Sequence, residues 1–171
     1  MNNKQILEYL DALNSELEVR GVLGEINLVG GAVMCLVFKS RESTEDIDAI
    51  FEPKKIMYEC IKLVAETYHL PSDWINDGVK GFLSKSAEFV SYYKLSNLHI
   101  WTASPEYMLA MKCLSARMDN VNERDDIKFL LHLLQVKNLS QAVEIILKYY
   151  PKRLFQAKTQ YAIEEILEEL L

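Results

Sequence analysis

The chain has 171 residues, of which half are hydrophobic, and this is enough for one well-packed core or for a core with a small appendage. Its formal net charge of -6 argues against strong DNA binding over a broad face, because such binding requires clustered Lys and Arg. The polar N-terminus and the lack of any apolar run of about 20 residues predict a protein without a leader peptide or a membrane segment.

Three cysteines, an odd number, lie in separate apolar stretches of the sequence at Cys35, Cys60 and Cys113. Isolated cysteines in such surroundings are typical of reduced core residues rather than of disulfides or zinc ligands. Reduced thiols fit a reducing compartment, so we expect a cytoplasmic protein.

The sequence pattern of residues 1–103 predicts a small mixed α/β core. Apolar positions at helical spacing indicate an amphipathic helix from residue 3 to about residue 20. The segment "INLVGG" then predicts a buried strand that ends in a glycine turn, "AVMCLVFK" a short helix, and "EDIDAIF" a second strand. A helix closed by Pro71 and two further strands, "EFVSYY" and "NLHIWTA", complete this part.

Residues 104–171 predict a helical region packed on that core. Ser104 and Pro105 supply an N-cap and a first-turn proline for a helix that runs to about Met118. Three more helical stretches are predicted over residues 123–136, 140–149 and 152–170. Ser140 is the expected cap of the second of these. The predicted fold class is therefore α+β, with a mixed-sheet core followed by helices.

Two pairs of residues in residues 1–103 predict binding sites. Side chains alternate along a strand, so Asp46 and Asp48 point the same way, and like charges so placed repel unless a cation lies between them. Paired carboxylates on a rigid strand suit Mg²⁺. Gly30 and Gly31 allow close backbone approach and present N–H groups at a helix start, which favours a phosphate. The two pairs together predict a pocket for a nucleoside triphosphate bound through Mg²⁺.

Each pair alone would favour a purely structural interpretation, but their order in the chain is more specific. A strand, a Gly-Gly turn, a short helix and then "STEDID" resembles the signature of the polymerase-β-like nucleotidyltransferase superfamily. "LVGGAV" with "RESTEDIDAIF" resembles the first half of its small bacterial branch near the AbiEii-type toxin nucleotidyltransferases. "SPEYMLAMKCLSAR" with "RDDI" resembles the helical second half, so the resemblance covers roughly residues 25 to 135.

The resemblance implies an enzyme that moves a nucleoside monophosphate from an NTP to a hydroxyl on RNA, protein or a small molecule. It also implies metal ligands at Asp46 and Asp48 and nucleotide-binding residues at Gly30, Gly31, Ser43 and Lys112. For Lys112 the alternative is a solvated lysine on the surface of its helix. A protein partner of the antitoxin kind, in a toxin–antitoxin or phage-defence pair, is a further implication.

A third carboxylate on a later strand usually completes the catalytic set in this superfamily. Glu88, at the start of "EFVSYY", is the only acid in the two later strands, so it is either that catalytic acid or an exposed strand-end residue. His99 is a weaker substitute, since a histidine in an apolar strand is more often a hydrogen-bonded core residue. Without a third acid, we expect a catalytically weakened module that binds a nucleotide or a partner.

Aromatic residues of the core have two interpretations. Trp74 follows a helix and is interpreted as a packing anchor in preference to a base-stacking residue. Tyr92, Tyr93 and Trp101 have the chemistry of a stacking surface for single-stranded nucleic acid, but the low density of basic residues around them disfavours that use.

Overall fold

The computed structural model describes residues 1–115 and 120–170, and the chain divides into two compact units. The first unit consists of Met1–Gly81 and Phe89–Ala103, and the second of Phe82–Glu88 and Ser104–Leu171. Strands lie in the first unit and helices dominate the second, so the predicted α+β class is confirmed. The short segment before the fourth strand belongs with the helices, although the sequence analysis placed it in the core.

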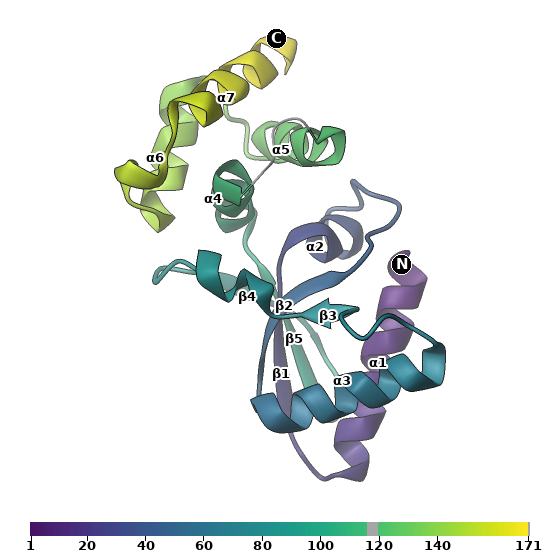
Figure 1. The fold of residues 1–171 in the computed structure, drawn as a ribbon. Coiled ribbons are helices and arrows are strands. Elements are labelled where there is room, and N and C mark those ends of the chain that lie inside the picture. The colour runs from purple at the N-terminus through teal and green to yellow at the C-terminus, as the bar shows by residue number, and fades with distance from the viewer. Residues whose placement is uncertain (116–119, 171) are drawn as a thin grey trace. The chain divides into compact units, whose positions relative to one another are not determined.

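The first unit is built on a five-stranded mixed sheet (Figure 1). Its elements in chain order are α1 (Asn3–Val19), β1 (Gly24–Leu28), α2 (Gly30–Leu36), β2 (Ile47–Glu52), α3 (Lys54–Tyr68), β3 (Ile75–Asn76), the 3-10 turn η1 (Gly78–Phe82), β4 (Phe89–Lys94) and β5 (Leu98–Ala103). The strand order is β3-β2-β1-β5-β4. β1 runs antiparallel to β2 and parallel to β5, and β4 returns antiparallel to β5.

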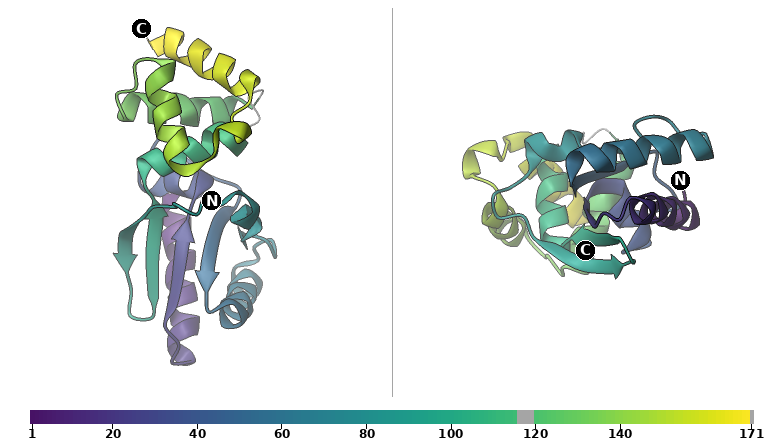
Figure 2. Two further views of the ribbon diagram at one scale, coloured as in Figure 1. Left: turned by 90° about the vertical axis from the view of Figure 1, so that its left-hand side faces the viewer. Right: turned by 90° about the horizontal axis from the view of Figure 1, so that it is seen from below.

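One face of the sheet carries the core of this unit. Ile26 of β1 lies opposite Phe51 of β2 and Ile100 of β5, and all three side chains are buried. Helices α1 and α3 lie side by side against this face (Figures 1 and 2). The ring of Phe51 contacts Tyr58 of α3 at 5.0 Å between ring centroids, which shows how directly helix and sheet pack.

The opposite face of the sheet is more polar and more exposed. Residues of the strands alternate, so the next row across the three central strands consists of Ile50, Asn27 and Trp101, all half-buried. Asp48 lies on the same face as Ile50, two residues earlier in β2. The Asp48 side chain therefore points away from the core under α1 and α3.

The second unit is helical. It contains α4 (Pro105–Ser115), α5 (Val121–Leu133), α6 (Leu139–Tyr149), the 3-10 turn η2 (Lys152–Leu154) and α7 (Ala157–Leu170). Helix α4 contacts α5 and α6, and α7 contacts the same two helices. Its core includes Tyr107, Leu130, Ile146 and Ile163, each fully buried.

Three details of the helical prediction differ from the structure. The predicted end of α4 at Met118 lies outside the described residues. The stretch 152–170 is not one helix, since η2 precedes α7. The cap of α6 is Asn138, whose side chain accepts a hydrogen bond from the backbone N–H of Gln141 at 3.0 Å; the prediction of Ser140 was wrong because the helix begins one residue before it.

All three cysteines are buried and free, as predicted. Burial raises the pKa of the Cys113 thiol to about 12, so this thiol stays protonated at neutral pH. Among the helices of the described ranges, none has both the length and the apolar character needed to cross a bilayer.

Candidate functional site

The turn between β1 and α2 brings a carboxylate against a glycine. Gly30 has φ of +64°, a left-handed conformation that side chains rarely adopt. A Cβ atom at Gly30 would lie 2.9 Å from Oδ2 of Asp48. The backbone N–H of Val29 also donates to the carbonyl oxygen of Asp48 at 3.0 Å. Glycine is therefore required here both by the backbone and by the position of the Asp48 carboxylate.

Asn76 shows that the two aspartates share one face of the sheet. Asp48 pairs with Asn76 in the parallel β2–β3 register, and paired residues of neighbouring strands point to the same side. The amide Nδ2 of Asn76 donates to Oδ2 of Asp46 at 3.0 Å. Asp46 directly precedes β2, yet its carboxylate is held on the Asp48 face by this bond. All three side chains are half-buried.

The loop between α2 and β2 adds a hydroxyl and a guanidinium beside the second glycine. A Cβ at Gly31 would collide with the hydroxyl of Thr44 and lie 3.4 Å from Nη1 of Arg41. Thr44 Oγ1 donates to the carbonyl oxygen of Asp46 at 3.1 Å, which ties this loop to the start of β2. Sequence reasoning missed Arg41 and Thr44 as candidates, although both stand in "RESTEDID", because no periodicity places a loop residue.

Ser43 lies in the loop between α2 and β2. It is exposed, and its backbone forms an isolated bridge with Asn2. The hydroxyl next to Gly31 belongs instead to Thr44, one residue later. A contact between Ser43 and a nucleotide stays a prediction.

Lys112 is half of a buried ion pair in the second unit. It lies on α4 and is only 7% exposed, and its Nζ is 2.7 Å from Oδ2 of Asp126 on α5. Glu123 lies farther away, at 4.0 Å from the same nitrogen. Lys112 is therefore not the solvated surface lysine of the alternative interpretation. Its predicted contact with a nucleotide stays a prediction.

Glu88 precedes β4 and belongs to the second unit. Its Oε2 accepts hydrogen bonds from the hydroxyl of Tyr149 at 2.6 Å and from Ser104 Oγ at 3.2 Å. Burial, and then the bond to this carboxylate, raise the pKa of Tyr149, so its hydroxyl remains a donor. Glu88 is thus an exposed residue at the start of the strand, as its second interpretation expected, and its carboxylate accepts two hydroxyl hydrogen bonds.

His99 and Trp74 have structural partners. His99 Nε2 lies 2.8 Å from Ser91 Oγ, and its ring packs on Trp101 at 4.1 Å between centroids. Trp74 is 1% exposed and donates from Nε1 to the carbonyl oxygen of Ile61 at 3.1 Å, which confirms its interpretation as a packing anchor.

The donor set at Asp46 and Asp48 suits Mg²⁺. Within the described part of the chain, no group of three His, Cys, Asp or Glu residues is placed to hold a metal. Mg²⁺, however, is commonly bound by one or two carboxylates together with substrate phosphates and water. Two half-buried carboxylates beside a glycine turn fit that mode of binding.

Comparison of the chain with protein families, with curated proteins and with solved structures found no significant match. Any function proposed for the site therefore depends on its geometry and on the order of its motifs in the chain.

Proposed function

We propose that this protein is a Mg²⁺-dependent nucleotidyltransferase that moves a nucleoside monophosphate from an NTP to a hydroxyl acceptor on RNA, protein or a small molecule. One observation carries the proposal: the carboxylate of Asp48 packs against Gly30 while Asn76 holds Asp46 on the same face. Two acids and a glycine turn are thereby joined in one polar surface.

The residues around Gly31 suit a triphosphate. A glycine backbone lets phosphate oxygens come close to the main chain, because no side chain shields its N–H. The Arg41 guanidinium next to it supplies positive charge in a planar fork that matches phosphate oxygens.

The reaction would break the bond between the α-phosphorus and the pyrophosphate oxygen and form a bond from the acceptor oxygen to that phosphorus. Asp46 and Asp48 would hold Mg²⁺, which when bound offsets phosphate charge and favours in-line displacement. Asn76 would keep Asp46 in place through its amide bond. The acceptor proton passes to a carboxylate base, for which Glu88 is the candidate that the family resemblance implies.

A second candidate function is a binding module of the same fold, catalytically weakened and active through a protein partner in a toxin–antitoxin or phage-defence pair. Glu88 favours it, because its carboxylate already accepts two hydroxyl hydrogen bonds in the second unit. A base engaged in this way is less available to take a proton from an acceptor.

Label transfer distinguishes the two functions. The full chain would be incubated with NTPs labelled at the α-phosphate, Mg²⁺ and, in separate reactions, cellular RNA, protein and small hydroxyl compounds. An enzyme transfers label, Asp48→Asn abolishes the transfer, and Glu88→Gln abolishes it while NTP binding remains. The matched control Asp73→Asn removes an exposed carboxylate elsewhere in the first unit and leaves transfer unchanged.

The other outcomes are equally informative. NTP binding that requires Mg²⁺ and Asp48 but yields no transfer with any acceptor supports the binding module. Absence of NTP binding in the presence of Mg²⁺ contradicts the transferase and leaves only a module that binds a protein partner. For the location we propose the cytoplasm, since three buried thiols without a disulfide suit a reducing compartment.

A further inference from the structure

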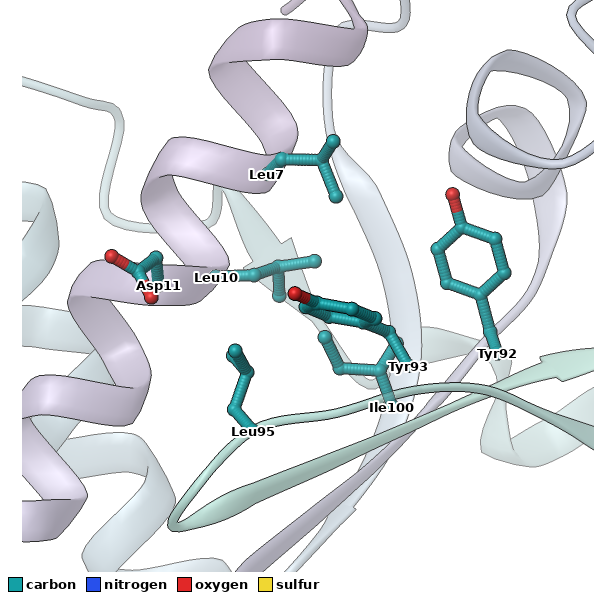
Figure 3. Close-up of a pocket in the computed structure, with 7 residues that line it drawn as sticks. All are labelled: Leu7, Leu10, Asp11, Tyr92, Tyr93, Leu95 and Ile100. Atoms are coloured by element: carbon teal, nitrogen blue, oxygen red, sulfur yellow. The ribbon is translucent and has the colours of Figure 1, made fainter.

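A cavity lies in the first unit on the α1 side of the sheet, the face opposite to Asp48 (Figure 3). Its volume is about 340 Å³, which falls in the range of about 300–1,000 Å³ usual for small-ligand sites. The residues that line it come from α1, β4, β5 and the turn between the two strands: Leu7, Leu10, Asp11, Tyr92, Tyr93, Leu95 and Ile100. The cavity therefore has an apolar floor and one charged residue.

A β-bulge directs two consecutive tyrosines into this cavity. The β4–β5 pairing passes from Ser91 opposite Trp101 to Tyr93 opposite Ile100. Tyr92 is therefore an extra residue of β4 that no residue of β5 opposes. Adjacent residues of a regular strand point to opposite faces, but Tyr92 and Tyr93 both line the cavity and both rings lie on its side of the strand in Figure 3. Bulges commonly re-aim side chains in this way near functional sites.

The other wall is a stripe of α1 with a carboxylate at its edge. Leu7, Leu10 and Asp11 are spaced three and four residues apart and so share one face of the helix. Leu7 and Leu10 point toward the tyrosines, whereas Asp11 lines the edge of the cavity with its carboxylate directed away from the rings (Figure 3). Among the described residues, no hydrogen bond or ion pair engages the exposed Asp11 carboxylate.

We infer that this cavity binds a small organic cation, namely an ammonium group on an aromatic or branched apolar body. The apolar body fits between Leu10, Ile100 and the ring of Tyr93, which is 54% exposed in the structure. The ammonium group pairs with Asp11 at the rim, and the faces of the tyrosine rings also attract cations. The inference does not depend on the proposed nucleotidyltransferase function.

The edge position of β4 argues for a small molecule in preference to a peptide strand. β4 is the last strand of the sheet, and its outer edge is the place where an added strand would pair. The bulge at Tyr92 interrupts the regular spacing of backbone groups along that edge. Strand addition is therefore disfavoured, whereas the cavity beside the bulge remains open to a compact ligand.

The test uses the full chain and two probes of similar size, 2-phenylethylammonium and phenylacetate, titrated by isothermal calorimetry and by proton NMR of the tyrosine rings. We expect saturable binding of the cation and at least about fivefold weaker binding of the anion. Asp11→Asn should weaken cation binding by about three- to fivefold, the range of an exposed ion pair. Tyr93→Ala should weaken it by about five- to tenfold through the lost ring contact.

Asp73→Asn is the matched control, because it removes an exposed carboxylate of the same unit that does not line the cavity, and it should leave affinity unchanged. Asp11 and Tyr93 are both exposed, so their variants should fold, as circular dichroism would verify. No saturable binding of 2-phenylethylammonium, equal affinity for phenylacetate, or an unchanged affinity in Asp11→Asn would each overturn the inference.

Discussion

At the scale of single residues, Gly30 and Lys112 were both predicted to bind a nucleotide, and the structure shows that different contacts constrain them. Gly30 is dictated by its surroundings, since a left-handed backbone and the neighbouring Asp48 carboxylate both exclude a side chain. Lys112 is likewise constrained, but its partner Asp126 lies on the next helix of the second unit. In the sequence, the glycine turn and the lysine both resemble parts of a nucleotide-binding motif. Their contacts differ, because Gly30 lies against the Asp48 carboxylate and Lys112 pairs with Asp126.

Gly30→Ala tests whether Asp48 depends on the glycine turn. Alanine in a left-handed conformation costs about 1–2 kcal/mol of unfolding free energy, and the new Cβ must also displace Oδ2 of Asp48. We expect that loss of stability in urea unfolding. If Mg²⁺ and NTP bind as proposed, they raise the melting temperature of the parent protein, and Gly30→Ala should lose this rise.

Two other glycines provide controls for this substitution. Gly21 also has a left-handed backbone, with φ of +61°, but a Cβ there meets nothing within 4 Å, so Gly21→Ala should cost similar stability and keep the ligand-dependent rise. Gly81→Ala has neither strain nor crowding and should change stability by less than about 0.5 kcal/mol. A Gly30→Ala protein with the full ligand response would contradict the link between Gly30 and Asp48.

At the scale of elements, the start of α6 is set by Asn138. Its side chain accepts from the backbone of Gln141, and the Gln141 side chain accepts from the backbone N–H of Lys137 at 2.8 Å. The same Asn-x-x-Gln spacing begins α1, where Asn2 and Gln5 form a capping box. Ser140 lies inside the first turn and contributes no such cap.

Two alanine variants compare these positions directly. Asn138→Ala removes the cap and should lower the free energy of unfolding by about 1 kcal/mol. Ser140→Ala should leave it unchanged or raise it slightly, because alanine is the better helix former inside the helix. Urea unfolding at neutral pH measures both, and an equal loss in the two variants would contradict the assigned helix start.

The elements with a clear period were predictable, and the short or aperiodic ones were not. Alternation predicted β2 with Asp48 on its polar side, and helical spacing predicted α1, because each pattern extends over several residues. β3 has only two residues, too few for any period. Asn76 therefore escaped notice, although it fixes Asp46.

The N-cap of α6 was predicted wrongly for a different reason. The Asn-x-x-Gln spacing from Asn138 to Gln141 is present in the sequence, but the prediction named only Ser140, which is also a good capping residue. The ion pair of Lys112 with Asp126 had no local signal at all, since the partners lie on separate helices.

At the scale of the whole molecule, each unit has its own core, and both tryptophans of the chain belong to the first. Trp74 and Trp101 lie in the unit that holds the sheet, while the pair of Lys112 and Asp126 lies in the helical unit. Tryptophan fluorescence therefore reports on one core, and hydrogen exchange of peptides from α4 to α7 reports on the other. The two probes allow a change in one unit to be located.

Lys112→Ala removes the ammonium group that lies 2.7 Å from the carboxylate of Asp126, a residue only 2% exposed. Removing one partner of a buried ion pair typically costs up to about 3–5 kcal/mol, because the buried charge that remains loses a counter-charge. We expect faster hydrogen exchange throughout α4–α7 and a smaller change in the tryptophan unfolding midpoint. Unfolding of the variant would by itself lower the measured nucleotide affinity. Affinity therefore has to be measured at a temperature where Lys112→Ala remains folded.

Two further variants determine whether the ion pair itself is responsible. Lys62→Ala removes a lysine that is 77% exposed and 3.9 Å from Glu66, and it should change stability by less than about 0.5 kcal/mol. The double variant Lys112→Met/Asp126→Leu replaces both charges by apolar groups and should recover part of the stability lost in Lys112→Ala. No recovery in the double variant would contradict the ion pair as the source of the lost stability, and an equal shift of both probes in Lys112→Ala would mean that the two cores unfold as one.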